Sequence, residues 1–433
     1  MFWNEERKHY TDFCLLFYHI LKAMYKISYS PNLKGEVQIS WSKNAALPIV
    51  AANYLLDNKL TLHNKPNIKD VNAMEHLANQ ALQTSTDFFD LTSDAATKFR
   101  ASILLIPVWL IKYGKVKFVG SGGCSIGKRP LDMFDDALVK AGIKITNDEF
   151  KTFEVVGKPK KNIMLQGFSV TAVEALITYL AFSNNFDYDI TIYQVAIEPH
   201  VRNLIDFLNN AGADITLLVD HTIVVKPSKI QIKESDFTII ADYIEAGTYF
   251  AIGAGADNSE ITIKWCNVDE LSAMYSIADR MWINFKIVDK YTITVNSYNK
   301  KNYQAAKLET RIYPGFPTDL QSIFGTLFTQ CDGISKVFET LYEGRFAYLN
   351  ELENLGAKIE ILNPYQAIVI GPTHLKGNYV SSKDLRCWGA MMLAGIMAHG
   401  TTFVMNEDII ARWYDDIEHK LRAIWVNIEH IEW

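Results

Sequence analysis

The stretch Leu208-Asn209-Asn210-Ala211-Gly212-Ala213-Asp214-Ile215 carries the pattern that decides the fold. Its leucine is followed after three residues by glycine, then by a small residue, another residue and an apolar one. This order is typical of the last turn of a helix, a residue in the left-handed region and the entry into a strand. The flanking segments Asp189 to Ile192 and Thr222 to Val225 alternate apolar and polar residues, as strands do. The stretch therefore predicts an α/β unit.

The same template recurs along the chain. Further copies are LVKAGIKI (138–145), ADRMWINF (278–285), LENLGAKI (352–359) and LRAIWVNI (421–428). With Gly212, the fifth positions are 142, 212, 282, 356 and 425, so the spacings are 70, 70, 74 and 69 residues. An earlier copy is expected near position 72, where Ala73 to Leu77 predicts its helix and the following hairpin is short or missing. Six α/β repeats of about 70 residues nearly account for the chain.

The composition is that of an ordinary folded protein. The chain has 433 residues, of which 49% are apolar and 21% are charged, which excludes a disordered, collagenous or coiled-coil chain. The formal charge of -6 gives no reason to expect a nucleic-acid partner or an anionic membrane surface. Any anion site must therefore be local.

The cysteines and the apolar runs indicate the compartment. Five cysteines are widely spaced, with no CxxC or Cys/His ligand spacing, so neither a disulfide framework nor a metal site is favoured. A cytoplasmic location fits best, and Cys266, Cys331 and Cys387 are expected to be buried structural thiols. No uncharged apolar run is long enough for membrane insertion: the run from Ala101 to Ile111 stops at Lys112.

The segment GSGGCSIGKRP (120–130) is the most informative one for chemistry. Its glycines predict a mobile loop in which backbone N–H groups, Lys128 and Arg129 surround an anion and activate the thiol of Cys124. The alternative is a glycine-rich turn with an incidental cysteine.

At this loop the sequence resembles the UDP-N-acetylglucosamine 1-carboxyvinyltransferase family, enolpyruvyl transferases whose mobile loop carries a GGCxIGxRP pattern. The similarity covers about residues 24 to 433, whereas the sister family that acts on shikimate phosphate lacks the cysteine loop. Other segments match in order: LKGEVQISWSKNAALPI (33–49), KFRASI (98–103), FPTDLQ (316–321), ETLYEGRF (339–346), DLRCWGAMMLAG (384–395) and RWYDDIEHKLRAI (412–424).

The resemblance implies an α/β fold: a two-domain inside-out α/β barrel, the enolpyruvyl transferase fold, with three repeats per domain, helices inward and sheets outward. One domain is continuous, from about 44 to 241, and carries the cysteine loop. The other combines about 24–43 with 242–433, and the active site is expected in the cleft. Residues 1–23 precede the matched region and are expected to be a non-native or disordered extension, or the product of a mis-assigned start.

The resemblance also implies catalytic roles. Cys124 matches the proton donor to the methylene carbon of phosphoenolpyruvate, and Asp319 matches the carboxylate that takes the proton of the sugar 3-hydroxyl. Lys43, Arg129 and Arg412 match the groups that hold the phosphate and carboxylate of phosphoenolpyruvate. The adduct then loses phosphate, and this chemistry requires no metal or other cofactor.

The remaining substrate contacts are carried over in the same way. The implied partners are phosphoenolpyruvate and UDP-N-acetylglucosamine, and no protein partner is evident. Leu341 matches a residue that lines the sugar site, and Arg345 and Arg386 match arginines that reach the site on closure. The other implied contacts are Asn44 beside Lys43 and, for the nucleotide, Arg100, Arg129, Pro130, Leu131, Asp132, Met133, Ser169 and Val170.

Each of these residues also has a simpler interpretation. Lys43 could be a solvated surface charge. Asp319 could cap the helix that follows it, because Thr-Asp before an apolar run is a common helix start. Arg412 could form a surface ion pair with a nearby acid, and Arg100 could cap its own helix end.

Three departures from the family pattern leave other functions open. Gly167 replaces a usual lysine, Thr171 a usual glycine and Tyr243 a usual arginine. A transferase of the same fold with another acceptor is one alternative. A non-catalytic paralogue that binds the sugar nucleotide and regulates the pathway is another, although the joint presence of Cys124 and Asp319 argues against it.

The tryptophans carry a separate hypothesis. Where the family usually has glycine, this chain has Trp41, Trp282, Trp388, Trp413 and Trp425, with a less clear match at Trp265. The chain has 23 Gly and 9 Trp, and counting all nine as glycine raises the glycine share from about 5% to about the average of 7%. We hypothesise that the gene belongs to a code in which UGA means glycine. The alternative is genuine divergence.

Overall fold

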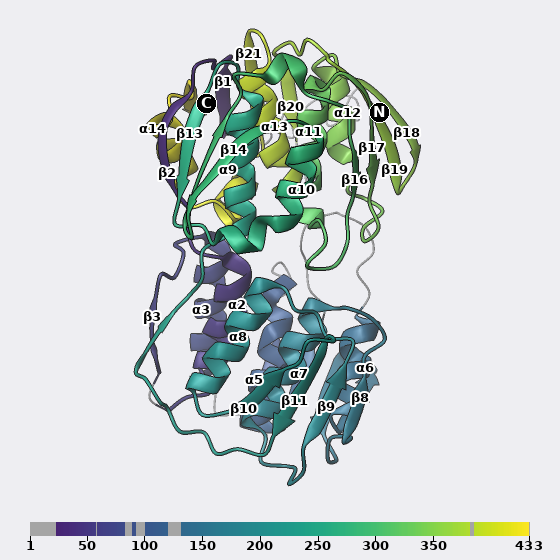
Figure 1. Ribbon diagram of the computed structural model, residues 1–433. Coiled ribbons are helices and arrows are strands. Elements are labelled where there is room, and N and C mark those ends of the chain that lie inside the picture. Colours follow the sequence, from purple (N-terminus) through teal and green to yellow (C-terminus); the bar gives the residue numbers. More distant parts are fainter. Residues whose placement is uncertain are drawn as a thin grey trace, which may run out of the picture. The chain divides into compact units, whose positions relative to one another are not determined.

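The computed structural model describes residues 23–57, 59–82, 89–91, 100–119, 131–381 and 385–432 (Figure 1). The described residues form two compact units. Unit 1 contains residues 23–39 and 243–432, and unit 2 contains residues 40–119 and 131–242. In the sequence, the described residues of unit 2 lie between the two parts of unit 1.

Unit 2 has a helical centre. Helices α2 (Lys43–Asn53), α5 (Leu105–Tyr113) and α7 (Val170–Phe182) are apolar around most of their circumference, and such helices must be buried on all sides. From Ala172 onward every residue of α7 is buried. Helices with one apolar face cover this centre: α3 (Lys69–Leu82), α6 (Asp132–Lys140) and α8 (Pro199–Asn210). A short 3-10 helix, η1 (Arg100–Leu104), leads into α5.

Three sheets belong to unit 2. One has the order β4 (Phe89–Leu91), β5 (Lys115–Phe118), β7 (Lys151–Val155), β6 (Ile143–Asn147), and another has the order β10 (Asp214–Leu217), β11 (Thr222–Lys226), β9 (Ile190–Tyr193), β8 (Asn162–Met164). The third pairs only β12 (Asp236–Thr238) with β3 (Thr61–His63), in parallel. The helix predicted near position 72 is α3, and in the described part of the chain the hairpin that follows it in the other repeats is missing.

Unit 1 repeats this plan. Helices α9 (Tyr243–Gly255), α11 (Thr318–Leu327) and α13 (Leu385–Met397) pack on one another, and Figure 1 shows strands on either flank of them. The covering helices are α10 (Ser272–Arg280), α12 (Ala347–Asn354) and α14 (Ile417–Ala423). Short 3-10 helices are η2 (Val268–Leu271), η3 (Lys300–Asn302), η4 (Phe328–Gln330) and η5 (Glu407–Arg412). The predicted arrangement of helices inside sheets is confirmed in each unit.

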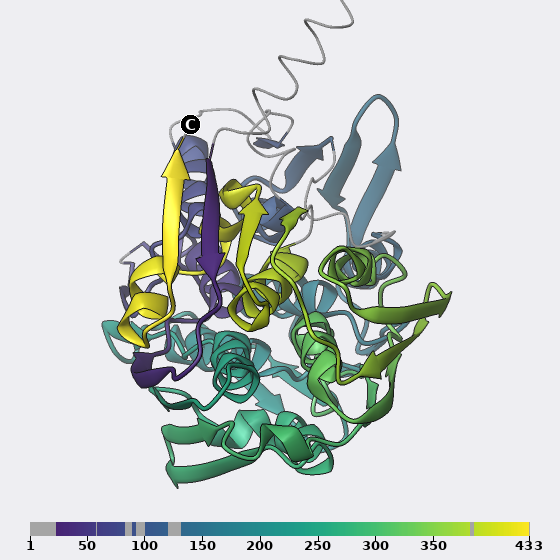
Figure 2. The same cartoon turned by 90° about the horizontal axis from the view of Figure 1, so that it is seen from above.

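All three sheets of unit 1 have four strands. Their orders are β20 (Tyr379–Ser381), β21 (Thr401–Met405), β1 (Ala23–Ser28), β22 (Ile428–Glu432); β14 (Asn284–Asp289), β15 (Thr292–Asn296), β13 (Glu260–Lys264), β2 (Lys34–Gln38); and β16 (Lys307–Glu309), β17 (Gly333–Phe338), β19 (Gln366–Gly371), β18 (Lys358–Asn363). Figure 2 shows β1, in purple, beside strands from the yellow end of the chain. Met24 of β1 lies opposite Met405 on one side and Ile431 on the other.

The predicted left-handed residue is present in every copy of the template. The backbone φ angle is 88° at Gly142, 110° at Gly212, 60° at Trp282, 94° at Gly356 and 70° at Trp425. The residue after it closes the helix end in four copies, as where the Ile283 amide donates to the Ala278 carbonyl at 3.0 Å. The prediction from the repeat is therefore confirmed.

A positive φ costs a non-glycine residue about 1–2 kcal/mol, and three tryptophans adopt one. Trp265 has a φ of 63°, and like Trp282 and Trp425 it is exposed, so little burial offsets the strain. Trp388 differs because it is fully buried in α13, where its indole N–H meets no acceptor among the described residues. The three exposed left-handed sites are unfavourable for tryptophan, which supports the glycine hypothesis at those positions.

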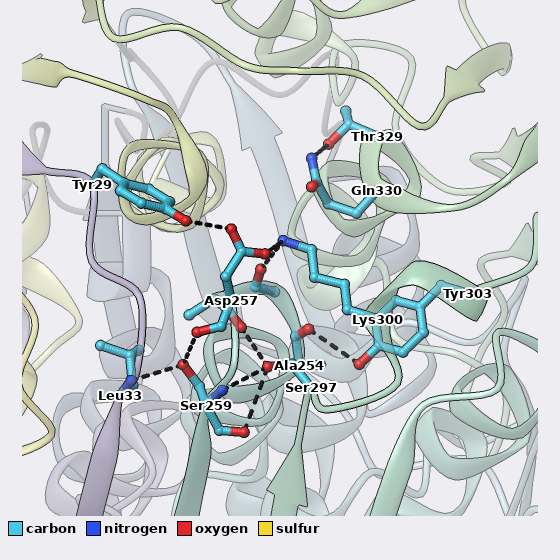
Figure 3. A network of polar contacts seen from close by, with 12 residues as sticks. Tyr29, Leu33, Ala254, Asp257, Ser259, Ser297, Lys300, Tyr303, Thr329 and Gln330 are labelled. Atoms are coloured by element: carbon cyan, nitrogen blue, oxygen red, sulfur yellow. Dashed lines mark hydrogen bonds and ion pairs between the residues drawn. The ribbon is translucent and has the colours of Figure 1, made fainter.

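A polar cluster closes the C-terminal end of α9 (Figure 3). Lys300 donates to the Gly255 carbonyl at 2.5 Å and to Asp257 Oδ1 at 2.8 Å, and the Tyr29 hydroxyl donates to Asp257 Oδ2 at 2.6 Å. A cation at this position complements the helix dipole. Burial raises the pKa of Asp257, but Lys300 and Tyr29 outweigh it, so the net pKa is lowered. The cluster fastens the segment after β1 to the core of unit 1.

Candidate active site

Asp319 lies between two arginines at the start of α11. Arg345 Nη2 donates to Asp319 Oδ1 at 2.6 Å, and Arg386 Nη2 donates to Oδ2 at 2.7 Å. The arginine side chains are 5% and 2% exposed, whereas that of Asp319 is 23% exposed. The helix begins at Thr318 with Pro317 at its N-cap position, so the interpretation of Asp319 as the capping residue is wrong.

The charge state of this carboxylate follows from its neighbours. Burial alone raises the pKa of Asp319, but Arg386 and Arg345 outweigh it through their charges and hydrogen bonds. The net pKa is held well below its usual range, so the carboxylate is ionised at neutral pH. An arginine that moved away would make this carboxylate a stronger base.

Arg386 connects this triad to the segment that contains Arg412. Its guanidinium lies 3.3 Å from the centre of the Trp413 ring, close enough for a cation–π contact. The next residue, Tyr414, is held to α9 by a 3.0 Å hydrogen bond between its hydroxyl and that of Thr248. Arg412 is the last residue of η5 and is half-buried. Unit 1 thus places Arg412 one residue from a ring that stacks on Arg386.

In unit 2, Lys43 is the first residue of α2. Ser42 caps the helix by accepting the Ala45 amide at 3.3 Å. The ammonium of Lys43 lies 2.5 Å from Asp70 Oδ2, and both side chains are nearly buried. The interpretation of Lys43 as a solvated surface charge is therefore wrong. Asn44 follows it and is half-buried.

Sequence reasoning did not find Asp70. It lies in the first turn of α3, where an acid is usually explained by the helix dipole alone. The run Ile68-Lys69-Asp70-Val71 before an apolar periodic segment was the available signal, but nothing in it points to a partner 27 positions earlier. The ion pair with Asp70 fixes the direction of the Lys43 side chain.

Several predicted nucleotide contacts lie at helix N-termini of unit 2. Leu131 is at the N-cap position of α6 and Asp132 and Met133 open that helix. Ser169 caps α7 by accepting the Ala172 amide at 3.3 Å, and Val170 is the first residue of that helix. Such ends attract phosphate groups because their N–H groups point outward.

The remaining predicted residues are dispersed. Arg100 is the first residue of η1, so it lies at the N-terminal end, where a cation does not cap a helix. Leu341 of unit 1 is 40% exposed. Cys124, Arg129 and Pro130 lie outside the described residues.

Three features bear on the compartment and on metals. Cys266, Cys331 and Cys387 are buried free thiols, as predicted, and burial raises the pKa of Cys266 to about 11 and that of Cys331 to about 12. Among the described residues, no group of three or more His, Cys, Asp or Glu side chains could hold a metal ion. No helix in the described part of the chain has the length and apolar character needed to cross a membrane.

Known proteins share both the sequence and the fold. A family model described as EPSP synthase (3-phosphoshikimate 1-carboxyvinyltransferase) matches residues 27–421. The UDP-N-acetylglucosamine 1-carboxyvinyltransferase of Sulfurimonas denitrificans is 33% identical over 425 residues, which cover 94% of this chain and 99% of that protein. The protein of the same name from Pseudothermotoga lettingae is 34% identical over 417 residues, covering 92% and 97%.

Two solved structures have the same architecture. The enolpyruvyl transferase NikO from Streptomyces tendae matches with a TM-score of 0.82 at 20% identity, over 95% of this chain and 99% of that one. EPSP synthase from Acinetobacter baumannii matches with a TM-score of 0.70 at 11% identity, over 95% and 100%. The fold is therefore that of the enolpyruvyl transferases, as predicted. The chain itself belongs to the UDP-N-acetylglucosamine 1-carboxyvinyltransferase family, so the resemblance seen at the cysteine loop is confirmed.

Proposed function

We propose that this chain transfers the enolpyruvyl group of phosphoenolpyruvate to the 3-hydroxyl of UDP-N-acetylglucosamine and releases phosphate. The relatives that match almost the full chain carry the name of this reaction. The observation in the structure that supports it best is the ionised carboxylate of Asp319 between Arg345 and Arg386. The reaction needs such a group because the sugar hydroxyl must lose a proton as it attacks.

In the proposed mechanism, two side chains move the protons of the addition step. Asp319 accepts the proton of the 3-hydroxyl, and Cys124 donates a proton to the methylene carbon of phosphoenolpyruvate. The sugar oxygen bonds to the adjacent carbon, and a later loss of a methyl proton and cleavage of the C–O bond to phosphate restore the double bond. Lys43, Arg129 and Arg412 hold the phosphate and carboxylate groups of phosphoenolpyruvate, with Asn44 beside them.

Arg345 and Arg386 control the basicity of Asp319. While both are bonded to Asp319, its pKa is held low and the carboxylate is a weak base. An anionic substrate that drew Arg345 or Arg386 toward itself would raise that pKa when the substrate is in place. This coupling gives these arginines a role in the timing of proton removal.

The nucleotide is proposed to bind along unit 2. The N-termini of α6 and α7, with Leu131, Ser169 and Val170, suit a diphosphate because of their outward N–H groups. Leu341 is proposed to contact the sugar. The further proposed contacts are Arg100, Arg129, Pro130, Asp132 and Met133.

The test is phosphate release from phosphoenolpyruvate with and without UDP-N-acetylglucosamine. We expect release that requires the sugar nucleotide and that falls at least about 100-fold in Cys124→Ala. Cys266→Ala is the matched control because this thiol is buried elsewhere, and it should retain activity. The chain used should begin at Met24 and carry glycine in place of the three exposed left-handed tryptophans, Trp265, Trp282 and Trp425.

Other outcomes would favour the alternatives. Phosphate release that requires a different acceptor would favour a transferase of the same fold that acts on that acceptor. A folded protein that binds the nucleotide without turnover would favour the regulatory paralogue.

We further propose that the reaction takes place in the cytoplasm as the first committed step of peptidoglycan precursor synthesis, on which cell shape and division depend. The free thiols of Cys266, Cys331 and Cys387 fit a reducing compartment. Depletion of the protein in its host should cause UDP-N-acetylglucosamine to accumulate and the cells to lose their shape. Normal growth and nucleotide levels after depletion would contradict this placement.

A further inference from the structure

Glu339, the residue that follows β17, is a buried carboxylate that the proposed reaction does not use. It is 1% exposed, and both of its oxygens accept hydrogen bonds from the protein itself. Its Oε1 accepts the Leu341 amide at 2.9 Å, the Tyr342 amide at 3.2 Å and the Thr310 hydroxyl at 3.1 Å. Its Oε2 accepts the Thr318 hydroxyl at 2.8 Å. All four of these donors are neutral.

These bonds join three separate segments. Thr310 follows β16 and Thr318 is the first residue of α11. Leu341 and Tyr342 lie in the loop from Thr340 to Arg345. A second set of bonds reinforces the junction, since the Thr340 amide donates to the Thr310 hydroxyl at 2.9 Å and the Thr340 hydroxyl donates to the Thr310 carbonyl at 2.7 Å.

The bonds of Glu339 form a junction that holds the segments of both Asp319 and Arg345. Asp319 immediately follows Thr318, and Arg345 is held to the loop by a 3.3 Å bond from its amide to the Tyr342 carbonyl. The guanidinium of Arg345 also lies 5.3 Å from the centre of the Tyr342 ring. A shift of the loop relative to α11 would therefore change the distance between base and cation directly.

We propose that Glu339 is a positioning residue that fixes the loop from Thr340 to Arg345 against the start of α11 and so sets the geometry of Asp319, Arg345 and Leu341. A single buried carboxylate suits this task because its two oxygens can serve several donors at once. A carboxylate accepts hydrogen bonds from such donors more strongly than a neutral group does. The proposal rests on the proposed function for its kinetic consequence, and on the contacts alone for its structural one.

The first test compares Glu339→Gln with Glu309→Gln. Glutamine keeps the size of the side chain but turns one acceptor oxygen into a donor. That donor cannot pair with the Leu341 and Tyr342 amides, and it pairs with the Thr318 hydroxyl only if that hydroxyl turns to accept. We expect kcat to fall about 100-fold, because a displacement of about 1 Å at a reacting group costs that much. The KM for UDP-N-acetylglucosamine should rise about tenfold and that for phosphoenolpyruvate should stay within about twofold.

Glu309→Gln is the matched control. Glu309 is a carboxylate one residue before Thr310, but it pairs with Lys307 at 2.9 Å and Arg311 at 2.7 Å outside the junction. It should leave both kinetic constants unchanged. An equal loss of kcat in both variants would show a general charge effect and overturn the proposal.

A pair of variants at Thr318 isolates the link to the helix. Thr318→Val removes the hydroxyl that bonds Glu339 and should lower kcat about tenfold, whereas Thr318→Ser keeps it and should stay within about threefold of wild type. Equal activities for the valine and serine variants would contradict the proposal. So would a rise in the KM for both substrates in Glu339→Gln, because a merely structural defect has no reason to single out the sugar nucleotide.

Hydrogen exchange separates this inference from the proposed function. In Glu339→Gln the amides of Leu341 and Tyr342 should exchange at least about tenfold faster, while those of β17 should keep their protection. If wild type shows no turnover, the proposed function fails and the exchange result alone decides whether Glu339 holds the loop. Unchanged exchange at these two amides would overturn the inference whether or not the enzyme is active.

Discussion

Asp319 shows how a single residue can be held ready for a reaction. Its two partners keep the pKa low, so the rate should have no acid limb from Asp319 between about pH 5 and 8. Arg386→Met removes a cation that lowers the pKa of Asp319, so this pKa should rise and the acid limb of the kcat/KM profile should move to higher pH. The profile of phosphate release against pH measures this. Arg280→Met, on the surface of α10, should leave the profile unchanged.

The pKa of Glu174 is shifted in the opposite direction to that of Asp319, with a consequence for stability. Burial, and then the neighbouring Glu198, raise its pKa well above the ordinary value of 4.5. A carboxyl with a raised pKa destabilises the fold as pH rises above its unfolded value, by ~1.4 kcal/mol per pH unit until the folded pKa is reached. Glu174→Gln should therefore stabilise the protein, and more at pH 8 than at pH 5.

Urea unfolding at the two pH values tests this. Glu154→Gln is the control because Glu154 is a partly exposed acid with a 3.7 Å ion pair to Lys115. It should change stability by less than about 0.5 kcal/mol at either pH. The same gain at pH 5 and pH 8 for Glu174→Gln would show that Glu174 is ionised in the folded protein.

Some residues of the candidate site can be predicted from the sequence, and others can be recognised only in the folded structure. Lys43 and Asp319 stand in short runs that match a family, so they could be chosen without coordinates. Asp70 and Glu339 could not, because each acts through side chains that are distant in sequence. Their importance comes from burial and from a partner, and neither is written in a local pattern.

At the scale of elements, the repeat carried most of the information. The order of helix, left-handed residue and strand follows from a short template, and the angles at Gly142, Gly212 and Gly356 confirm it. The pairing of strands could not be derived in this way, since β13 pairs with β2 across more than 200 positions. Such pairing depends on tertiary packing, which local patterns do not encode.

The left-handed tryptophans give a test at this scale. Trp282→Gly and Trp425→Gly should each raise the free energy of unfolding by about 1 kcal/mol, because glycine adopts positive φ without strain and the lost side chains are exposed. Denaturant titration measures this. Trp109→Gly is the contrasting control: this ring is fully buried in α5, so its loss should cost at least about 3 kcal/mol.

The coding hypothesis can be examined in the natural protein. Peptide mass spectrometry of the chain from its own host should find glycine at positions 282 and 425. Tryptophan at both would establish genuine divergence and leave the strain as a property of this protein.

At the scale of the whole molecule, unit 2 should fold by itself. Its hydrophobic core is drawn from residues between Ala45 and Ile239, and its two ends are bonded together: the Ser42 amide donates to the Ile240 carbonyl at 2.7 Å and the Asp242 amide to the Ser40 carbonyl at 2.8 Å. A fragment of residues 40–242 should therefore unfold cooperatively in thermal and urea titrations. A non-cooperative transition would contradict this.

The same fragment tests the predicted boundaries. A version cut at 44 and 241 lacks Ser42, the cap of α2, and the bridge between Trp41 and Ala241. It should be less stable than the 40–242 fragment by about 1 kcal/mol or more. Equal stability would support the boundaries read from the sequence.

The position of β1 has a consequence for how the protein is made. At ~10 residues per second, a ribosome releases β1 roughly 40 s before its partners β21 and β22. The stretch encoded between them can mature while translation continues, but the first strand waits with both edges open. A chain that ends before β21 leaves both backbone edges of β1 without these partner strands.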